Sequence, residues 1–210
     1  MKIDRKTLLL TTLVCLIPFA AGVMVYSRLP ETVATHFSFD GEPDGWSSRA
    51  FAVFGLPTIM LAMNFILQFA LNADPKRQNM SPALLTVVFW TVPVLSVVCS
   101  GITLAKALGY NIRIEVVLPV LMGVLFIIIG NYLPKTKQSY TMGIRLPWTL
   151  NSEENWNRTH RFAGFLWVLC GLLFLVMSFI GLSIPLFLIL MAVMVLIPVA
   201  YSYLLYRRGI

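Results

Sequence analysis

Six long apolar stretches, separated by short polar turns and by two longer polar segments, dominate the pattern of this chain. The hydrocarbon core of a bilayer is about 30 Å thick and requires roughly 20 apolar residues in an α-helix, so each stretch is long enough to cross it. The pattern therefore predicts an all-α integral membrane protein with a single membrane domain over residues 1–210. The predicted transmembrane helices cover residues 7–27, 50–72, 82–108, 116–133, 161–181 and 183–206.

The composition agrees with this class of protein. Hydrophobic residues make up 58% of the chain and charged residues 12%, and the mean hydropathy is +0.81. A water-soluble fold of this composition would expose more apolar surface than it could bury. The net charge of +7 then indicates topology signals and attraction to anionic lipid rather than direct nucleic-acid binding. The three cysteines, Cys15, Cys99 and Cys170, lie within apolar stretches. They predict neither disulfides nor a metal cluster.

The distribution of Lys and Arg predicts the orientation of the chain in the membrane. With a cytoplasmic N-terminus, twelve of these residues fall in inner segments and four in outer segments. Because positive residues accumulate on the cytoplasmic side, both termini are expected in the cytoplasm. Residues 134–160 then form a cytoplasmic loop that carries a motif, and residues 28–49 form an outer loop.

The outer loop has a pattern of its own. Larger or β-branched side chains at 33, 35, 37 and 39 alternate with Ala, His and Ser at 34, 36 and 38, and turn-forming residues follow at 40–45, so a short strand running into a turn is expected. His36 lies near several acids, but one histidine beside turn acids is weak support for a metal site, and none is predicted. The candidate binding residues of this loop are His36, Phe37, Asp40, Gly41, Pro43 and Gly45.

The inner loop begins with a segment that is expected to be extended. Pro147 disfavours helical angles at Leu146, and the whole of Gly143–Leu150 is interpreted as extended. A helix is expected to begin near Asn151 or Ser152, and Glu154 completes a capping box if Asn151 is the cap.

The helix that follows carries four side chains on one face. Trp156, His160, Ala163 and Trp167 recur at spacings of four, three and four, and the helix is expected to continue unbroken into the fifth span. One interpretation is that the tryptophans anchor the chain at the interface and the arginines only set topology. That interpretation leaves the regular arrangement with Pro, Thr and His unexplained, and a binding surface is the alternative. Its candidate residues are Asn131, Gly143, Arg145, Pro147, Trp148, Thr149, Trp156, Arg158, His160 and Arg161.

These residues carry a resemblance to a known family. Gly143-Ile144-Arg145-x-Pro147-Trp148-Thr149-Leu150, followed by Trp156, Arg161-Phe162-Ala163 and Cys170-Gly171, resembles the signature of the bacterial sporulation-delaying-protein immunity family. The outer loop, with Leu29-Pro30-Glu31, His36-Phe37 and Gly41-Glu42-Pro43-Asp44-Gly45, resembles the small membrane domain of unknown function that precedes this signature in many members.

The resemblance implies a function and its partners. It implies a six-span protein of the bacterial plasma membrane that protects its cell against a secreted, membrane-active peptide toxin. The best-known member also acts as a signalling receptor that holds a transcriptional repressor at the membrane. One position departs from the family's usual Arg-Thr-Pro-Trp, because Leu146 follows Arg145 here, so a role of that threonine hydroxyl is not carried over.

Polar residues within the spans bear on the alternative that the protein is a transporter or channel gated by its two long loops. Asn64 and Gln68 are four residues apart on one helix face and are expected to hydrogen-bond between helices. The predicted spans carry no Asp or Glu at mid-membrane, which argues against a proton-coupled transporter. Binding and export both remain open from the sequence.

The two halves of the chain also share short sequences. Leu29-Pro30-Glu31-Thr32 matches Leu133-Pro134-Lys135-Thr136, and each is followed by a long loop that enters the next helix at Arg49-Ala50-Phe51 or Arg161-Phe162-Ala163. With three spans in each half, an inverted 3+3 repeat is predicted.

The sequence does not favour an enzyme. Ser139 or Ser152 with His160 has no spacing that fixes a catalytic triad, and the chain has neither a glycine-rich phosphate loop nor a pair of metal ligands on a helix. No cofactor is predicted. The expected partners are membrane lipid and, as the resemblance implies, a peptide toxin and a cytoplasmic repressor.

Overall fold

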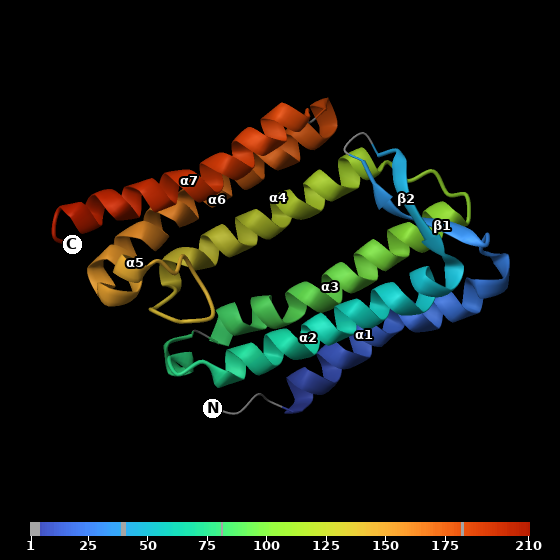
Figure 1. Ribbon diagram of the computed structural model, residues 1–210, viewed down its shortest axis with the longest axis horizontal. Helices are drawn as coiled ribbons and strands as arrows, with labels where there is room; N and C mark the ends of the chain where they lie inside the picture. The colour runs from blue at the N-terminus through green and yellow to red at the C-terminus, as the bar shows by residue number, and fades with distance from the viewer. Residues whose placement is uncertain (1–4, 39–40, 81, 182) are drawn as a thin grey trace. The chain divides into compact units, whose positions relative to one another are not determined.

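The computed structural model describes residues 5–38, 41–80, 82–181 and 183–210, and only the backbone of Arg77. In this part of the chain six helices are long and apolar enough to cross a membrane, as the sequence predicts (Figure 1). Their cores are α1 (Arg5–Val25), α2 (Leu56–Ala73), α3 (Pro82–Ala107), α4 (Ile114–Tyr132), α6 (Glu153–Ile180) and α7 (Ile184–Arg207).

The chain forms two compact units. The first contains the residues up to Asn72 together with Leu85–Ile114, and the second contains Ala73–Leu84 together with Glu115–Ile210. Three long helices therefore belong wholly or mainly to each unit, in agreement with the predicted division into halves. The twofold relation of an inverted repeat stays a prediction.

A β-hairpin caps one end of the first unit. Strand β1 (Thr32–Phe37) pairs antiparallel with β2 (Pro43–Ser48), and a bulge interrupts the register after Ala34. The first strand was predicted, whereas the second was not, because Pro, Asp and Gly at its start are poor strand formers. Proline at the first position of a strand removes no ladder hydrogen bond that the strand needs.

Two helices of the first unit are joined by buried hydrogen bonds. Short helices connect the hairpin to them, η1 (Tyr26–Arg28) after α1 and the π-helical η2 (Phe51–Gly55) before α2. The Nε2 amide of Gln68 donates to Thr11 Oγ1 at 2.9 Å and to Asn64 Oδ1 at 3.2 Å. All three side chains are buried, so the predicted bond between helices is confirmed.

In the second unit, α4 and α6 meet through two pairs of glycines. Gly123 faces Gly171, and Gly130 faces Gly164; a Cβ on any of them would lie 2.6 to 2.8 Å from the carbonyl oxygen of the facing glycine. Each helix repeats its glycine after seven residues, as two antiparallel helices need if the same seam is to meet twice. The absence of side chains lets the two backbones touch, which is how helices pack tightly in lipid.

Helices α6 and α7 lie side by side in Figure 1. Buried apolar side chains fill the contact, with Cys170 and Phe174 from α6 against Leu190 and Met194 from α7. The indole Nε1–H of Trp167 donates to the carbonyl of Met194 at 3.0 Å. The second unit is thus held by backbone contact on one side of α6 and by side-chain packing on another.

The glycine seam predicts a loss of stability for Gly130→Val. The added side chain must push against the backbone of α6, and overpacking of this kind costs about 1–3 kcal/mol. The measurement is thermal unfolding of the purified protein in detergent. Gly101→Val is the control, because a Cβ at Gly101 meets nothing within 4 Å; equal losses for the two variants would refute the role of the seam.

Candidate functional site

The motif loop, residues 133–152, joins α4 to α6. It begins with the helical turn η4 (Leu133–Lys135), continues as irregular backbone and enters the short helix α5 (Pro147–Asn151). Leu146 is extended as predicted, with φ −110° and ψ 154°. The prediction that extended chain continues to Leu150 is wrong, because the fixed φ of Pro147 suits the first position of a helix.

Ser152 caps the long helix α6. Its backbone is extended, and its hydroxyl accepts a hydrogen bond from the N–H of Asn155. Of the two predicted starts Ser152 is therefore correct, and the condition for a capping box with Glu154, a cap at Asn151, is not met. Glu153 and Glu154 in the first turn interact favourably with the positive end of the helix dipole. The helix runs from Glu153 to Ile180 without a break, as predicted.

The centre of the loop is an aromatic pair from the first turns of α6. Trp156 and His160 are fully buried, and their rings stack with centroids 4.0 Å apart. The indole Nε1–H of Trp156 donates to the carbonyl of Thr136 at 2.7 Å. Gly143 covers the pair with φ +102°, and a Cβ there would lie 2.5 Å from His160 Nε2 and 2.9 Å from the Trp156 ring. Both the conformation and the space require glycine.

Both ring nitrogens of His160 bind backbone groups. Nδ1 lies 2.8 Å from the carbonyl oxygen of Trp156, and Nε2 lies 2.9 Å from the N–H nitrogen of Ile144. A carbonyl only accepts and an N–H only donates, so Nδ1 carries the proton and Nε2 carries none. His160 is therefore a neutral structural residue that fixes the loop.

Thr149 closes the turn that presents Arg145. The Thr149 hydroxyl is buried; it accepts from the N–H of Leu146 at 2.9 Å and lies 2.8 Å from the carbonyl oxygen of Ile144, to which it donates. The carbonyl of Thr149 in turn accepts from the side-chain amide of Gln138 at 2.9 Å. The threonine of the motif thus has a structural role within the loop.

An acid that the sequence analysis missed holds the other side of the loop. Asp74 follows α2 directly, and its Oδ2 accepts from Ser139 Oγ at 2.8 Å and from the N–H and hydroxyl of Thr141 at 2.8 and 2.5 Å. Its Oδ1 accepts from the N–H of Lys76 at 2.7 Å. Burial by itself raises the pKa of Asp74, but these hydrogen bonds outweigh it and hold the pKa below its usual value.

Neighbours of Asp74 reach the same part of the loop. Asn79 donates from its side-chain amide to the carbonyl of Gln138 at 3.0 Å, and Lys76 donates to the side-chain oxygen of Gln138 at 3.3 Å. The Lys76 ammonium also lies 5.1 Å from the ring centroid of Tyr140. The signal for this contact in the sequence was small: Asp74 is the only acid between the second and third apolar stretches.

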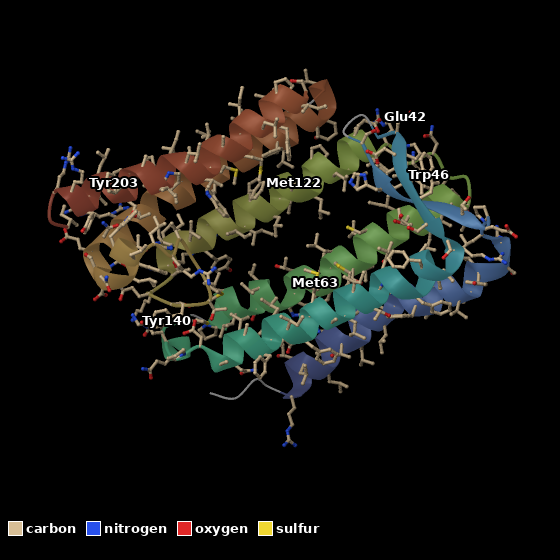
Figure 2. All side chains as sticks on the ribbon, in the orientation of Figure 1. Glu42, Trp46, Met63, Met122, Tyr140 and Tyr203 are labelled. Atoms are coloured by element: carbon tan, nitrogen blue, oxygen red, sulfur yellow. The ribbon has the colours of Figure 1, made fainter. Side chains whose placement is uncertain are left out.

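Trp148 joins α5 to α7. Its Nε1–H donates to Ser202 Oγ at 2.7 Å, and Ser202 donates to Asn155 Oδ1 at 2.8 Å. Its ring stacks on Tyr206 and meets the edge of Tyr203, which Figure 2 places on α7. A groove of about 440 Å³ opens beside it. The groove is lined by Pro147, Trp148, Asn151, Ser152, Tyr206, Gly209 and Ile210.

The charged candidate residues lie outside this network of buried contacts. Arg145 is exposed and donates to the carbonyl of Tyr140 at 2.6 Å. Arg158 is exposed and pairs with Glu154 one turn earlier. Arg161 on α6 and Asn131 on α4 are also exposed. The structure therefore brings Gly143, Thr149, Trp156 and His160 together as a support, and it leaves Arg145 at the surface of the turn.

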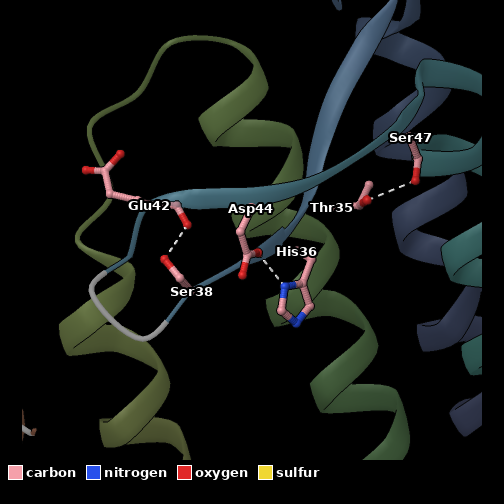
Figure 3. Close-up of polar contacts among 6 residues, drawn as sticks. All are labelled: Thr35, His36, Ser38, Glu42, Asp44 and Ser47. Carbon is pink, nitrogen blue, oxygen red and sulfur yellow. Dashed lines mark hydrogen bonds and ion pairs between the residues drawn. The ribbon is translucent and has the colours of Figure 1, made fainter. Parts of the chain in front are cut away.

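The candidates of the hairpin have local structural roles. His36 donates from Nδ1 to the carboxylate of Asp44, and Ser38 donates from both its N–H and its hydroxyl to the carbonyl of Glu42 (Figure 3). Gly41 has φ +83°, and a Cβ on Gly45 would lie 2.8 Å from that of His36.

The remaining hairpin candidates lie at its end. Phe37 receives the Lys106 ammonium over its ring, 5.6 Å from the centroid. Pro43 begins β2. Asp40 lies outside the described residues.

The six apolar helices define the class of the protein, a multi-pass membrane protein. Residues 135–202 match the SdpI/YfhL protein family, and residues 13–61 match a domain of unknown function, DUF1648. The chain is 28% identical over 203 residues to the Immunity protein SdpI of Bacillus subtilis (strain 168). The matched region covers 95% of this chain and 96% of the relative. No solved structure matches the chain. The resemblance predicted from the motifs is confirmed.

The Asp74 contacts predict that Asp74→Asn loosens the motif loop. The amide places N–H groups against the donors of Ser139 and Thr141, so residues 136–146 should become more sensitive to protease and exchange their amide protons faster. The depressed pKa implies that acid has the same effect: protection is complete above the ordinary pKa of an aspartate and is lost as the pH falls through the lower pKa of the folded protein.

Limited proteolysis of membranes from the Asp74→Asn strain measures this effect. Asp44→Asn is the matched control, because it changes an aspartate of the hairpin instead. If the loop of the Asp74→Asn protein is cut as slowly as that of the control, the carboxylate does not hold it.

Proposed function

We propose that this chain is an immunity protein that protects its cell against a secreted, membrane-active peptide toxin. The observation that carries the proposal is its similarity to an immunity protein over 95% of its length. The ordered motif loop supports it, because four of the motif residues are used to build a fixed support for an exposed arginine. A loop that served only to connect two spans would need none of these contacts.

We further propose that the motif loop is cytoplasmic and that the hairpin lies outside. Twelve of the sixteen Lys and Arg residues are on the cytoplasmic side in this orientation. The toxin then meets the hairpin side, and the surface around Arg145 and the groove beside Trp148 is available to a soluble partner. A transcriptional repressor held at this surface would make the protein a signalling receptor.

Protection and peptide retention can be measured in one experiment. A toxin-sensitive strain is exposed to purified sporulation-delaying peptide with and without this protein, and the peptide bound to membranes is quantified. Protection with retained peptide is expected for a binding protein. Protection with loss of peptide from the cells would instead support export through a transporter, and absence of any protection against this peptide would contradict the proposal.

Arg145 gives a specific prediction for this proposal. Arg145→Ala should abolish the function while leaving membrane insertion intact, because the side chain is exposed and, among the described residues, it donates only to the carbonyl of Tyr140. The measurement compares growth under toxin at equal membrane content of the protein. Lys137→Ala is the control, since it removes a positive charge from an exposed position of the same loop. Full protection by the Arg145 variant would mean that the motif arginine is only an anchor.

A further inference from the structure

A groove of about 510 Å³ lies beside the hairpin in the first unit. Strand β1 contributes the consecutive residues Thr32, Val33 and Ala34 and its last residue, Phe37, to the wall, whereas β2 contributes only its first residue, Pro43. Successive residues of a strand point to opposite faces, so a groove that touches three consecutive residues follows the edge of the strand rather than either face. The groove therefore runs along the edge of β1 that is turned away from β2.

The pairing of the hairpin defines which backbone groups point into this groove. The N–H of Arg49 donates to the carbonyl of Glu31 at 2.9 Å, so Glu31 faces β2. Backbone groups alternate in direction along an antiparallel strand, and Val33, which is paired with Ser47, also faces β2. Thr32 and Ala34 then direct their N–H and C=O groups away from β2. These are the groups with which a sheet edge accepts another strand.

The opposite wall of the groove comes from the end of α3 and the turn after it. Lys106 lines the groove with its ammonium group over the ring of Phe37, and Gly109, with φ +87°, turns the chain. Tyr110 lines the groove and is 63% exposed. The wall therefore offers aromatic and aliphatic surface together with one ammonium group, opposite a row of backbone donors and acceptors.

We propose that an extended peptide binds in this groove as a third strand, paired with the outer edge of β1, which pairs with no other strand in the described part of the chain. Backbone hydrogen bonds to Thr32 and Ala34 would provide affinity, and alternate side chains of the peptide would contact Tyr110 and Phe37. The occupant is the toxin of the proposed function, on which this inference rests. An extended chain is the partner that fits, because a helix has already satisfied its backbone groups and has none to give to a strand edge.

Photocrosslinking tests the location directly. A benzoylphenylalanine is placed at Tyr110 in one protein and at Trp46 in another, since both are exposed aromatic residues of the first unit, at 63% and 61%. Membranes containing each protein are irradiated with the sporulation-delaying peptide. A peptide adduct is expected from position 110 and not from position 46. An adduct only from position 46, adducts of equal yield, or none while the membranes retain peptide would overturn the proposal.

A pair of proline substitutions tests the strand pairing. Ala34→Pro removes an N–H on the outer edge of β1, whereas Trp46→Pro removes one on the opposite edge, because Trp46 is the pairing partner of Ala34. Proline is tolerated where the N–H points out of the sheet. Peptide retention should fall at least tenfold for Ala34→Pro and stay within twofold of the parent for Trp46→Pro.

An intact hairpin is verified by a cysteine pair at Thr35 and Ser47, whose hydroxyl oxygens are 2.9 Å apart. The disulfide should form as readily in the Ala34→Pro background as in the parent. If Ala34→Pro disrupts the hairpin, the crosslinking result decides alone.

The outcomes separate this inference from the proposed function. If the parent protein neither protects nor retains peptide, the proposed function fails first. If the parent protects and retains peptide but Ala34→Pro with an intact hairpin does the same, the groove is not the site. A crosslink from position 110 can also join two copies of the protein. If this crosslink forms without peptide and its yield does not fall when peptide is added, a second hairpin occupies the edge, and the proposal is overturned.

Discussion

The motif loop depends on the neutral imidazole of His160. Its Nδ1–H satisfies a carbonyl of its own helix, and its Nε2 accepts the N–H of Ile144, so one buried ring ties the irregular backbone to the start of α6. Trp156 stacks on the same ring, and Gly143 fits only because it has no side chain. Removal of the ring would leave the N–H of Ile144 without its partner, and an unpaired backbone donor inside the protein is costly.

Close packing at glycines also holds two helices of the second unit together. Lipid tails are as apolar as leucine, so helices in a membrane gain little from hydrophobic burial against each other and depend on close contact and hydrogen bonds. The facing glycines of α4 and α6 provide the contact, and the bond of Trp167 to the carbonyl of Met194 provides a tie to α7. Because α4, α6 and α7 are packed tightly, the motif loop between α4 and α6 has fixed ends and can keep a defined conformation.

The sequence predicted the spans, the first hairpin strand, the long helix α6 and the shared face of Trp156 and His160, because periodicity and length are local properties. It did not predict β2, whose Pro43 and Gly45 disfavour a strand until pairing with β1 compensates. It gave Asp74 no role, because the partners Ser139 and Thr141 are more than sixty residues away. It also assigned His160 to a binding surface, whereas its hydrogen bonds make it part of the support beneath Arg145.

The tautomer of His160 tests this account most directly. Nitrogen NMR of the protein labelled at histidine, in bilayers at cytoplasmic pH, distinguishes protonated from unprotonated ring nitrogens, and His160→Gln assigns the signal against His36. The account predicts a protonated Nδ1 and an unprotonated Nε2, with the Nε2 signal coupled to the N–H of Ile144. A doubly protonated ring, or a proton on Nε2, would contradict it.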